Sequence, residues 1–270
     1  MTGPPVVLGL AMNYRAEQLA PFVLSLRRSG YNGKIAFFCA NLSDDTQAFL
    51  RSQLVEIIPI PPGLYPPYHV QNARWFIYLE YLMRLLLAEA LPVSVFLTDV
   101  RDVVFQADPF ATPHGELDVF LENAEPVLGG CPFNSRWMRT CFGDHVLEEM
   151  AAQTIACSGT IQASGRGALR LALEMWDMMM AFTDVAACDV SDQAAYNVVV
   201  HRGLVDGLRI HANGGRVLTL HHVGHDRMQI DQNGVIYGPG GIVSPILHQY
   251  DRHPMLNDFI TARYAVALPA

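Results

Sequence analysis

The sequence predicts an α/β protein in which a mixed, mostly parallel central sheet is flanked by helices within a single domain. Two observations predict this class. Short apolar runs alternate with amphipathic segments of helical spacing in the first half, and such alternation connects parallel strands through right-handed crossovers. In addition, 51% of the 270 residues are hydrophobic, enough for one large core. We therefore expect one domain over residues 1–270.

The first half supplies a regular series of strands and helices. Gly30 closes the first helical segment, and each apolar run is bounded by turn residues. Four prolines within 61–68 preclude a helix or a central strand there. We expect strands at 6–11, 34–40 and 55–60, a strand beginning at Val95, and helices at 16–28, 44–54 and 72–90.

The second half is less regular, and we interpret the change as elaboration of one domain rather than a second domain. A tail rich in glycine and proline follows the last predicted strand. The expected elements are strands at 154–163, 205–211 and 217–223, and helices at 167–182 and 191–202.

Charge and composition exclude several classes of partner. The net charge is −8 and no run of lysine or arginine occurs, which argues against a nucleic-acid groove or a polybasic membrane patch. Charged residues interrupt the longest apolar segments, so we expect no transmembrane segment. The five cysteines contain no CxxC pair, which predicts reduced thiols and a cytoplasmic protein, with peripheral association with the inner face of the membrane left open.

An apolar run starting at Val95 leads into two acids, Asp99 and Asp102. A buried strand that ends in acids delivers oxygen ligands to the carboxyl edge of a sheet, where open α/β sheets bind ligands. Oxygen donors there suit Mg²⁺ or Mn²⁺ carrying a substrate diphosphate. The segment therefore indicates a nucleotide-linked substrate. An Asp-rich turn that only caps an exposed strand end is the alternative.

Three further signals accompany the acidic pair, in order along residues 6–254. They are a loop after the first strand, a small-residue loop with a later Asp-Gln helix start, and a late histidine: Met12-Asn13-Tyr14-Arg15, Cys157-Ser158-Gly159-Thr160 with Asp192-Gln193 and Asn197, and His248. Together with the acids, the ordered set resembles the GT-A fold glycosyltransferases, which move a sugar from a nucleotide diphosphate to an acceptor.

The resemblance implies a GT-A-like fold with a nucleotide-sugar-binding half at about 1–110 and an acceptor-side half at about 111–270. It implies a divalent metal, Mn²⁺ or Mg²⁺, held by Asp102 and His248, and catalysis near the anomeric carbon by Asp192 and Gln193. It also implies a set of donor-binding residues: Met12, Asn13, Tyr14, Arg74, Asp99, Arg101, Ser158 and Gly159.

The acids depart from the family's DxD spacing, because two residues separate them instead of one. Residues three apart on an extended strand face opposite sides, so both acids serve one site only if the chain turns between them. This spacing argues against Asp99 as a metal ligand and favours contact with the ribose or donor sugar, and the choice between metal and sugar stays open. Arg101 contacts the diphosphate or sugar, or pairs with an acid.

Two other candidates have structural alternatives. Arg74 suits bidentate phosphate or sugar contacts, but it is equally well explained as a solvated residue in a helix capped by Asn72. Asp192 serves as the base for inversion or stabilises an oxocarbenium ion during retention, or else Ser191 or Asp192 only caps a helix. The Asp-Gln and late-His pair is more similar to retaining members, which favours retention.

His221, His222 and His225 suggest a zinc cluster at first sight. Alternation on the predicted strand places His221 and His222 on opposite faces, and no nearby cysteine or HExxH spacing supports zinc. We therefore expect ordinary strand polarity, with one of them free to touch donor or acceptor.

The sequence thus predicts a metal-dependent glycosyltransferase that uses a nucleotide diphosphate sugar and a carbohydrate, lipid-linked or small-molecule acceptor, with polysaccharide biosynthesis as one setting. One rival is a non-catalytic nucleotide-sugar or glycan-binding module of the same fold. The other is a phosphatase, which is disfavoured because the only lysine, Lys34, precedes the acidic motif. The oligomeric state, the base and sugar of the donor and the acceptor's identity stay open.

Overall fold

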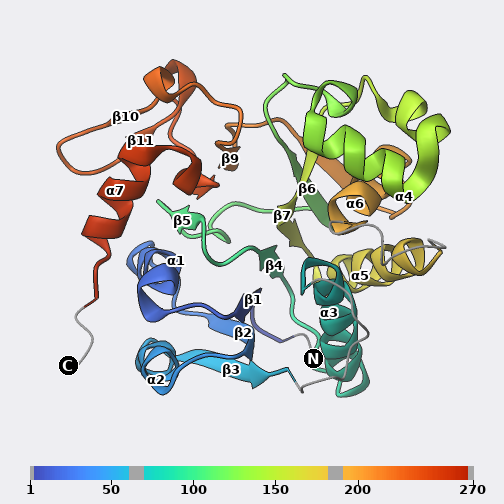
Figure 1. Ribbon diagram of the computed structural model, residues 1–270. Helices are drawn as coiled ribbons and strands as arrows, with labels where there is room; N and C mark the ends of the chain where they lie inside the picture. Colours follow the sequence, from blue (N-terminus) through green and yellow to red (C-terminus); the bar gives the residue numbers. More distant parts are fainter. Residues whose placement is uncertain (1–2, 61–69, 182–190, 267–270) are drawn as a thin grey trace.

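The computed structural model describes residues 3–60, 70–181 and 191–266, and its centre is a seven-stranded sheet (Figure 1). The strands lie in the order β3-β2-β1-β4-β7-β6-β8. Their bounds are β1 Val6–Met12, β2 Lys34–Ala40, β3 Val55–Pro59, β4 Val95–Thr98, β6 Leu117–Leu121, β7 Ala156–Ala163 and β8 Leu208–His211.

Four of the six strand pairings in this sheet are parallel. β1 pairs in parallel with β2 and β4, β2 with β3, and β6 with β8. β7 is antiparallel to both neighbours, β4 and β6. The prediction of a mixed, mostly parallel sheet is confirmed. Since β4 and β6 run in the same direction, their carboxyl ends meet at one edge of the sheet.

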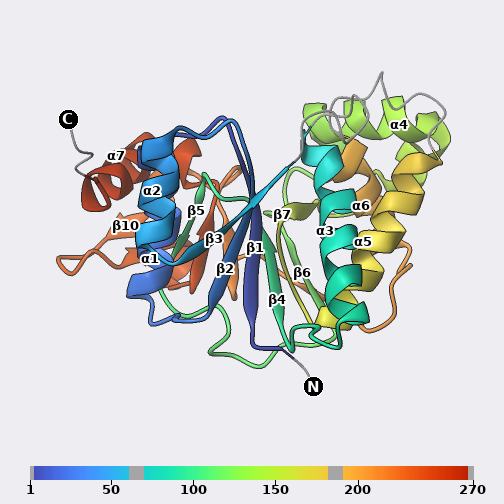
Figure 2. The ribbon, with the colours of Figure 1, turned by 90° about the horizontal axis from the view of Figure 1, so that it is seen from below.

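Helices cover both faces of the sheet (Figure 2). α1 (Ala16–Arg28) and α2 (Asp44–Ser52) lie on one face, and α3 (Val70–Leu87), α5 (Gly165–Met180) and α6 (Ser191–His201) lie on the other. Alternate residues of β1 point to the helices on opposite faces of the sheet. Val6 and Leu8 pack in the cluster under α3 and α5, whereas Val7 packs against α1. The buried strands are thus apolar on both faces.

A second, three-stranded sheet brings the end of the chain to the acidic segment. It consists of β5 (Val103–Phe105), β12 (Ile246–His248) and β9 (Val217–Thr219), with β12 in the middle. In the antiparallel register His248 lies opposite Val103, the residue after Asp102. α7 (Pro254–Arg263) and the hairpin of β10 (Gln229–Ile230) and β11 (Ile236–Tyr237) complete this side.

The expected elements of the first half are present with small differences at their ends, and the loop at 61–68 lies outside the described residues. In the second half, the strand expected at 217–223 ends at Thr219, because the chain turns there. The short strands β5, β10, β11 and β12 were not predicted, nor were three longer elements: β6, α7 and α4 (Pro132–Met150). α4 shows no single apolar face, and Gly143, with φ 81°, interrupts it, so helical periodicity was weak.

The prediction of reduced thiols is wrong for Cys141. Among the described cysteines, Cys39, Cys131 and Cys157 are free, but Cys141 is disulfide-bonded. No CxxC spacing marks Cys141, so the sequence could not indicate the bond. The expectation of a cytoplasmic protein loses the support that it drew from the thiols. Within the described ranges, no helix has the length and apolar character that crossing a membrane requires.

Candidate active site

The two acids lie on a turn directly after β4 and face the same histidine. β4 ends at Thr98, and residues 99–102 are not extended. Nε2 of His248 lies 3.5 Å from Oδ2 of Asp99 and 3.9 Å from Oδ1 of Asp102. The backbone N–H of Gln249 donates to the Asp102 carbonyl at 2.8 Å, which fixes the end of β12 against this turn. The turn between the acids, on which a shared site depends, is therefore present.

The cluster of Asp99, Asp102 and His248 fits a divalent cation. One donor atom from each residue lies within 4.8 Å of the others. His248 is fully buried, and its Nε2 has no hydrogen-bond partner in the described part of the chain. Gly159 leaves the space open, since a Cβ there would lie 2.5 Å from Cε1 of His248 and 2.6 Å from Oδ2 of Asp99. Two carboxylates and one imidazole suit Mn²⁺ or Mg²⁺.

Arg74 joins this cluster to the Asp-Gln helix start. Its guanidinium donates to Oδ1 of Asp99 at 2.8 Å and to Oγ of Ser158 at 2.8 Å, and it pairs with Asp192. Only 8% of Arg74 is exposed, so the alternative of a solvated helix residue is wrong. Burial alone would lower the pKa of Arg74, but the charges of Asp192 and Asp99 raise it.

Asp192 and Gln193 are both buried at the start of α6. The Asp192 carboxylate pairs with Arg74, and its backbone N–H donates to Oδ1 of Asn72 at 3.0 Å. Burial raises the pKa of Asp192, although the Arg74 charge opposes the shift. Oε1 of Gln193 accepts from the Ser158 hydroxyl at 2.7 Å. Asp192 is thus part of a buried network and does more than cap a helix, and Asn72 serves α6 rather than its own helix.

A cavity of about 310 Å³ opens beside the acids at the carboxyl edge of the sheet. Tyr14, whose pKa burial raises, lies on its wall. Arg101 pairs with Asp251 at 2.9 Å. Asn13, with φ 58°, forms the bend after β1 and is not among the wall residues. Six of the residues expected to bind donor or metal contribute to the wall: Met12, Tyr14, Arg74, Asp99, Arg101 and Asp102.

A second cavity, of about 200 Å³, adjoins the first, because Gln71, Arg74 and Asp99 line both. Ser158, Gly159, Asp192 and Gln193 line it as well. The wall also includes residues that were not predicted from the sequence, and most of them come from elements that were not predicted either: Glu122, Phe133, Asn134, Trp137, Gln249 and Arg252. Glu122 follows β6 as Asp99 follows β4, so the same rule would have indicated Glu122 if β6, which Asp118 interrupts, had been recognised as a strand.

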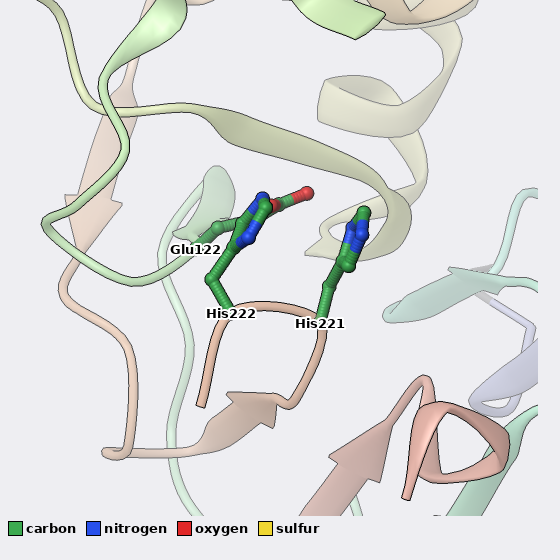
Figure 3. Close-up of side chains that lie close together, drawn as sticks. All are labelled: Glu122, His221 and His222. Atoms are coloured by element: carbon green, nitrogen blue, oxygen red, sulfur yellow. The ribbon is translucent and has the colours of Figure 1, made fainter. Parts of the chain in front are cut away.

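Glu122, His221 and His222 lie close together beside this second cavity (Figure 3). β9 ends before His221, so strand alternation does not apply, and the expectation of opposite faces is wrong. The two imidazole rings stack with centroids 4.1 Å apart. Burial raises the pKa of Glu122 to about 7 and lowers the pKa of both histidines, that of His221 to about 4.

Comparisons with known proteins identify the fold but no sequence family. No family model matches the chain, and no curated protein matches it in sequence. Among solved structures, an active-site mutant of the glycosyltransferase LgtC is similar, with a TM-score of 0.57 and 13% sequence identity over 97% of each chain. The chain therefore has a GT-A-like fold.

Proposed function

We propose that this protein transfers a sugar from a nucleotide diphosphate sugar to an acceptor with the help of a divalent cation. The observation that carries the proposal is the cluster of Asp99, Asp102 and His248 at the carboxyl edge of the sheet, where two cavities adjoin. Ligands bind at this edge in open α/β sheets. The GT-A-like fold of a known glycosyltransferase supports the same assignment.

In this proposal the 310 Å³ cavity takes the nucleotide diphosphate. Asp102 and His248 hold the cation, and Asp99 joins them through Oδ2 while Arg74 holds Oδ1. A bound cation neutralises charge on the leaving diphosphate. Met12, Asn13 and Tyr14, at the end of β1, take the nucleoside side, and Arg101 on the cavity wall adds positive charge near the diphosphate.

The anomeric carbon then lies where the cavities meet, near Asp192 and Gln193. The carboxylate of Asp192 is buried and held by Arg74, which places a fixed negative group where it can stabilise a positive sugar ring. We extend the proposal to retention of anomeric configuration on this basis. The anomeric coupling of the product, measured by nuclear magnetic resonance, tests it, and an inverted product would contradict it.

The second cavity takes the acceptor. Phe133, half exposed, and Trp137 place their rings 6.0 Å apart on its wall, which offers apolar contact to a sugar or lipid-linked sugar. Polar groups from Glu122 and Asn134 lie beside them. A carbohydrate, lipid-linked or small-molecule acceptor fits this mixture of aromatic and polar walls.

A phosphatase is a poorer explanation of the same acids. The phosphatase mechanism needs a lysine near the aspartates, and the only lysine in the sequence is Lys34. Lys34 begins β2, at the opposite edge of the sheet, and pairs with Glu56 at 2.7 Å.

Calorimetric titration with UDP, GDP and CDP, with and without Mn²⁺, tests donor binding. We expect one nucleotide to bind, and its affinity to fall at least about tenfold without Mn²⁺ or in the Asp102→Asn variant. Asp144→Asn is the matched control, because Asp144 forms an exposed pair with Arg139 and belongs neither to the cluster nor to the walls of the two cavities. Equal affinities in wild type and Asp102→Asn would contradict the assignment of the metal.

A further inference from the structure

We propose that Glu122, His221 and His222 form a second metal site, selective for zinc or a similar transition-metal ion, at the wall of the second cavity. The site shares no ligand with the Asp99, Asp102 and His248 cluster. It goes beyond the proposed sugar transfer and does not depend on it.

The carboxylate and one imidazole already lie at a separation that fits a shared ion. Oε2 of Glu122 and Nε2 of His222 are 3.9 Å apart, too far for a hydrogen bond, and neither has another partner among the described residues. Two ligand atoms that each lie about 2.0–2.2 Å from one zinc ion are separated by slightly less than the distance between Oε2 of Glu122 and Nε2 of His222. Glu122 is 6% exposed, so its unpaired oxygen is buried and lacks solvent as a partner.

His221 completes a set of three donors within 4.8 Å of one another. Figure 3 shows both imidazoles projecting from the same loop, with Glu122 next to His222. The stacked rings must tilt to direct both lone pairs at one ion, and rotation about the side-chain bonds allows this. Nδ2 of Asn123 donates to the His222 carbonyl at 3.1 Å, which holds the loop against the end of β6.

The donor set distinguishes this site from the first. Two imidazoles and one carboxylate form the three-ligand set of many catalytic zinc sites, which keep a fourth position open. Two carboxylates and one imidazole suit Mn²⁺ or Mg²⁺ instead. Because Glu122 and His221 also line the second cavity, an open position at the ion would be available to an oxygen atom of a molecule bound there.

Titration of the metal-free full-length protein with Co²⁺, followed by visible absorption and without nucleotide, tests this site. The Asp102→Asn variant serves as the background, because it removes a ligand of the first cluster. We expect one Co²⁺ per chain with a tetrahedral spectrum, displaced by Zn²⁺. Adding Glu122→Gln or His222→Asn should weaken binding at least about tenfold. His145→Asn is the control, because His145 is exposed on α4 and belongs to neither cluster.

Thermal unfolding with and without Zn²⁺ distinguishes a variant that has lost a metal ligand from a variant that folds poorly. We expect Zn²⁺ to raise the midpoint of thermal unfolding of the Asp102→Asn protein, and of the same protein with His145→Asn added. When His222→Asn is added instead, Zn²⁺ should leave the midpoint unchanged. Saturable binding that survives both Glu122→Gln and His222→Asn, or its absence from the background, would overturn the proposal. No nucleotide is present, so either result leaves the sugar-transfer proposal untouched.

Discussion

The two carboxylate and histidine clusters use similar side chains in opposite surroundings. In the first cluster, Asp99 is anchored by a guanidinium and His248 is fully buried. In the second cluster, His221 and His222 are only half-buried in a turn, and Oε2 of Glu122 has no hydrogen-bond partner in the described chain. The first cluster is therefore preorganised by a buried ion network, whereas the second depends on its ligand for order.

The largest expected effect comes from removing the ion network of the first cluster. Arg74→Met leaves Asp192 buried without its cation, which should lower the free energy of unfolding by about 3–5 kcal/mol. Urea denaturation measures it. Arg84→Met is the control, since Arg84 is exposed and pairs with Glu80 on its own helix, and it should change stability by less than about 1 kcal/mol. Equal losses of stability in Arg74→Met and Arg84→Met would show that the buried ion network does not stabilise the fold.

Asp118 on β6 can be compared with the acids of both clusters, because it is fully buried and each of its carboxylate oxygens has a hydrogen-bond partner. Arg209 and Arg216 donate to it at 2.7–3.1 Å. Burial alone would raise the pKa of Asp118, but hydrogen bonds from Arg209 and the Gly115 N–H, together with the adjacent His211 imidazole, lower it. Asp118→Asn should therefore cost about 2–3 kcal/mol at pH 7.

The sign of the pH dependence follows from the lowered pKa of Asp118. The wild-type advantage is present above the unfolded carboxyl value, about 3.9, and is lost as the pH falls through the lower folded pKa. Urea denaturation at pH 7 and at about pH 3 measures the loss. A difference between wild type and Asp118→Asn that stays constant over this range would contradict the role of the ion pairs.

The space that Gly159 leaves open can be removed with one methyl group. In Gly159→Ala the new Cβ would meet His248 and Asp99 at 2.5–2.6 Å, so these side chains must move apart. We expect metal-dependent nucleotide affinity to fall at least about tenfold and stability to fall by about 1–3 kcal/mol. Calorimetry and urea denaturation measure the two. Gly130→Ala, whose Cβ would meet Pro126 at an ordinary 3.6 Å, should change neither.

The smallest effect should come from the second cluster without metal. Glu122→Gln removes a carboxylate whose Oε2 has no partner in the described ranges, so stability should change by less than about 1 kcal/mol. Urea denaturation in the presence of a chelator measures it. A loss as large as that of Arg74→Met would show that Glu122 already belongs to a structural network.

The regular part of the fold was predictable because burial alone specifies it. β1, β2 and β4 are continuous apolar runs, buried on both faces. β6, with Asp118 inside it, and α4, interrupted by Gly143, offered no such pattern. Their positions depend on contacts with β7 and α6, which are distant in sequence.

The site was predictable to the extent that it lies at strand ends. The rule that strands deliver acids to the carboxyl edge predicted the position of Asp99 and Asp102, and it applies equally to Glu122. Strand alternation failed for His221 because it assumed that β9 continued beyond Thr219. The link from Arg74 to Asp192 joins residues 118 positions apart and has no local signature.

The most direct test of the central claim is nucleotide diphosphate release from a panel of UDP-, GDP- and CDP-sugars with Mn²⁺, with water and simple saccharides as acceptors. The account predicts release from one donor class, well above the protein-free rate, which disappears on chelation and in Asp102→Asn. Binding of a nucleotide without release from any donor would contradict the account, because the protein would then be a binding module of this fold.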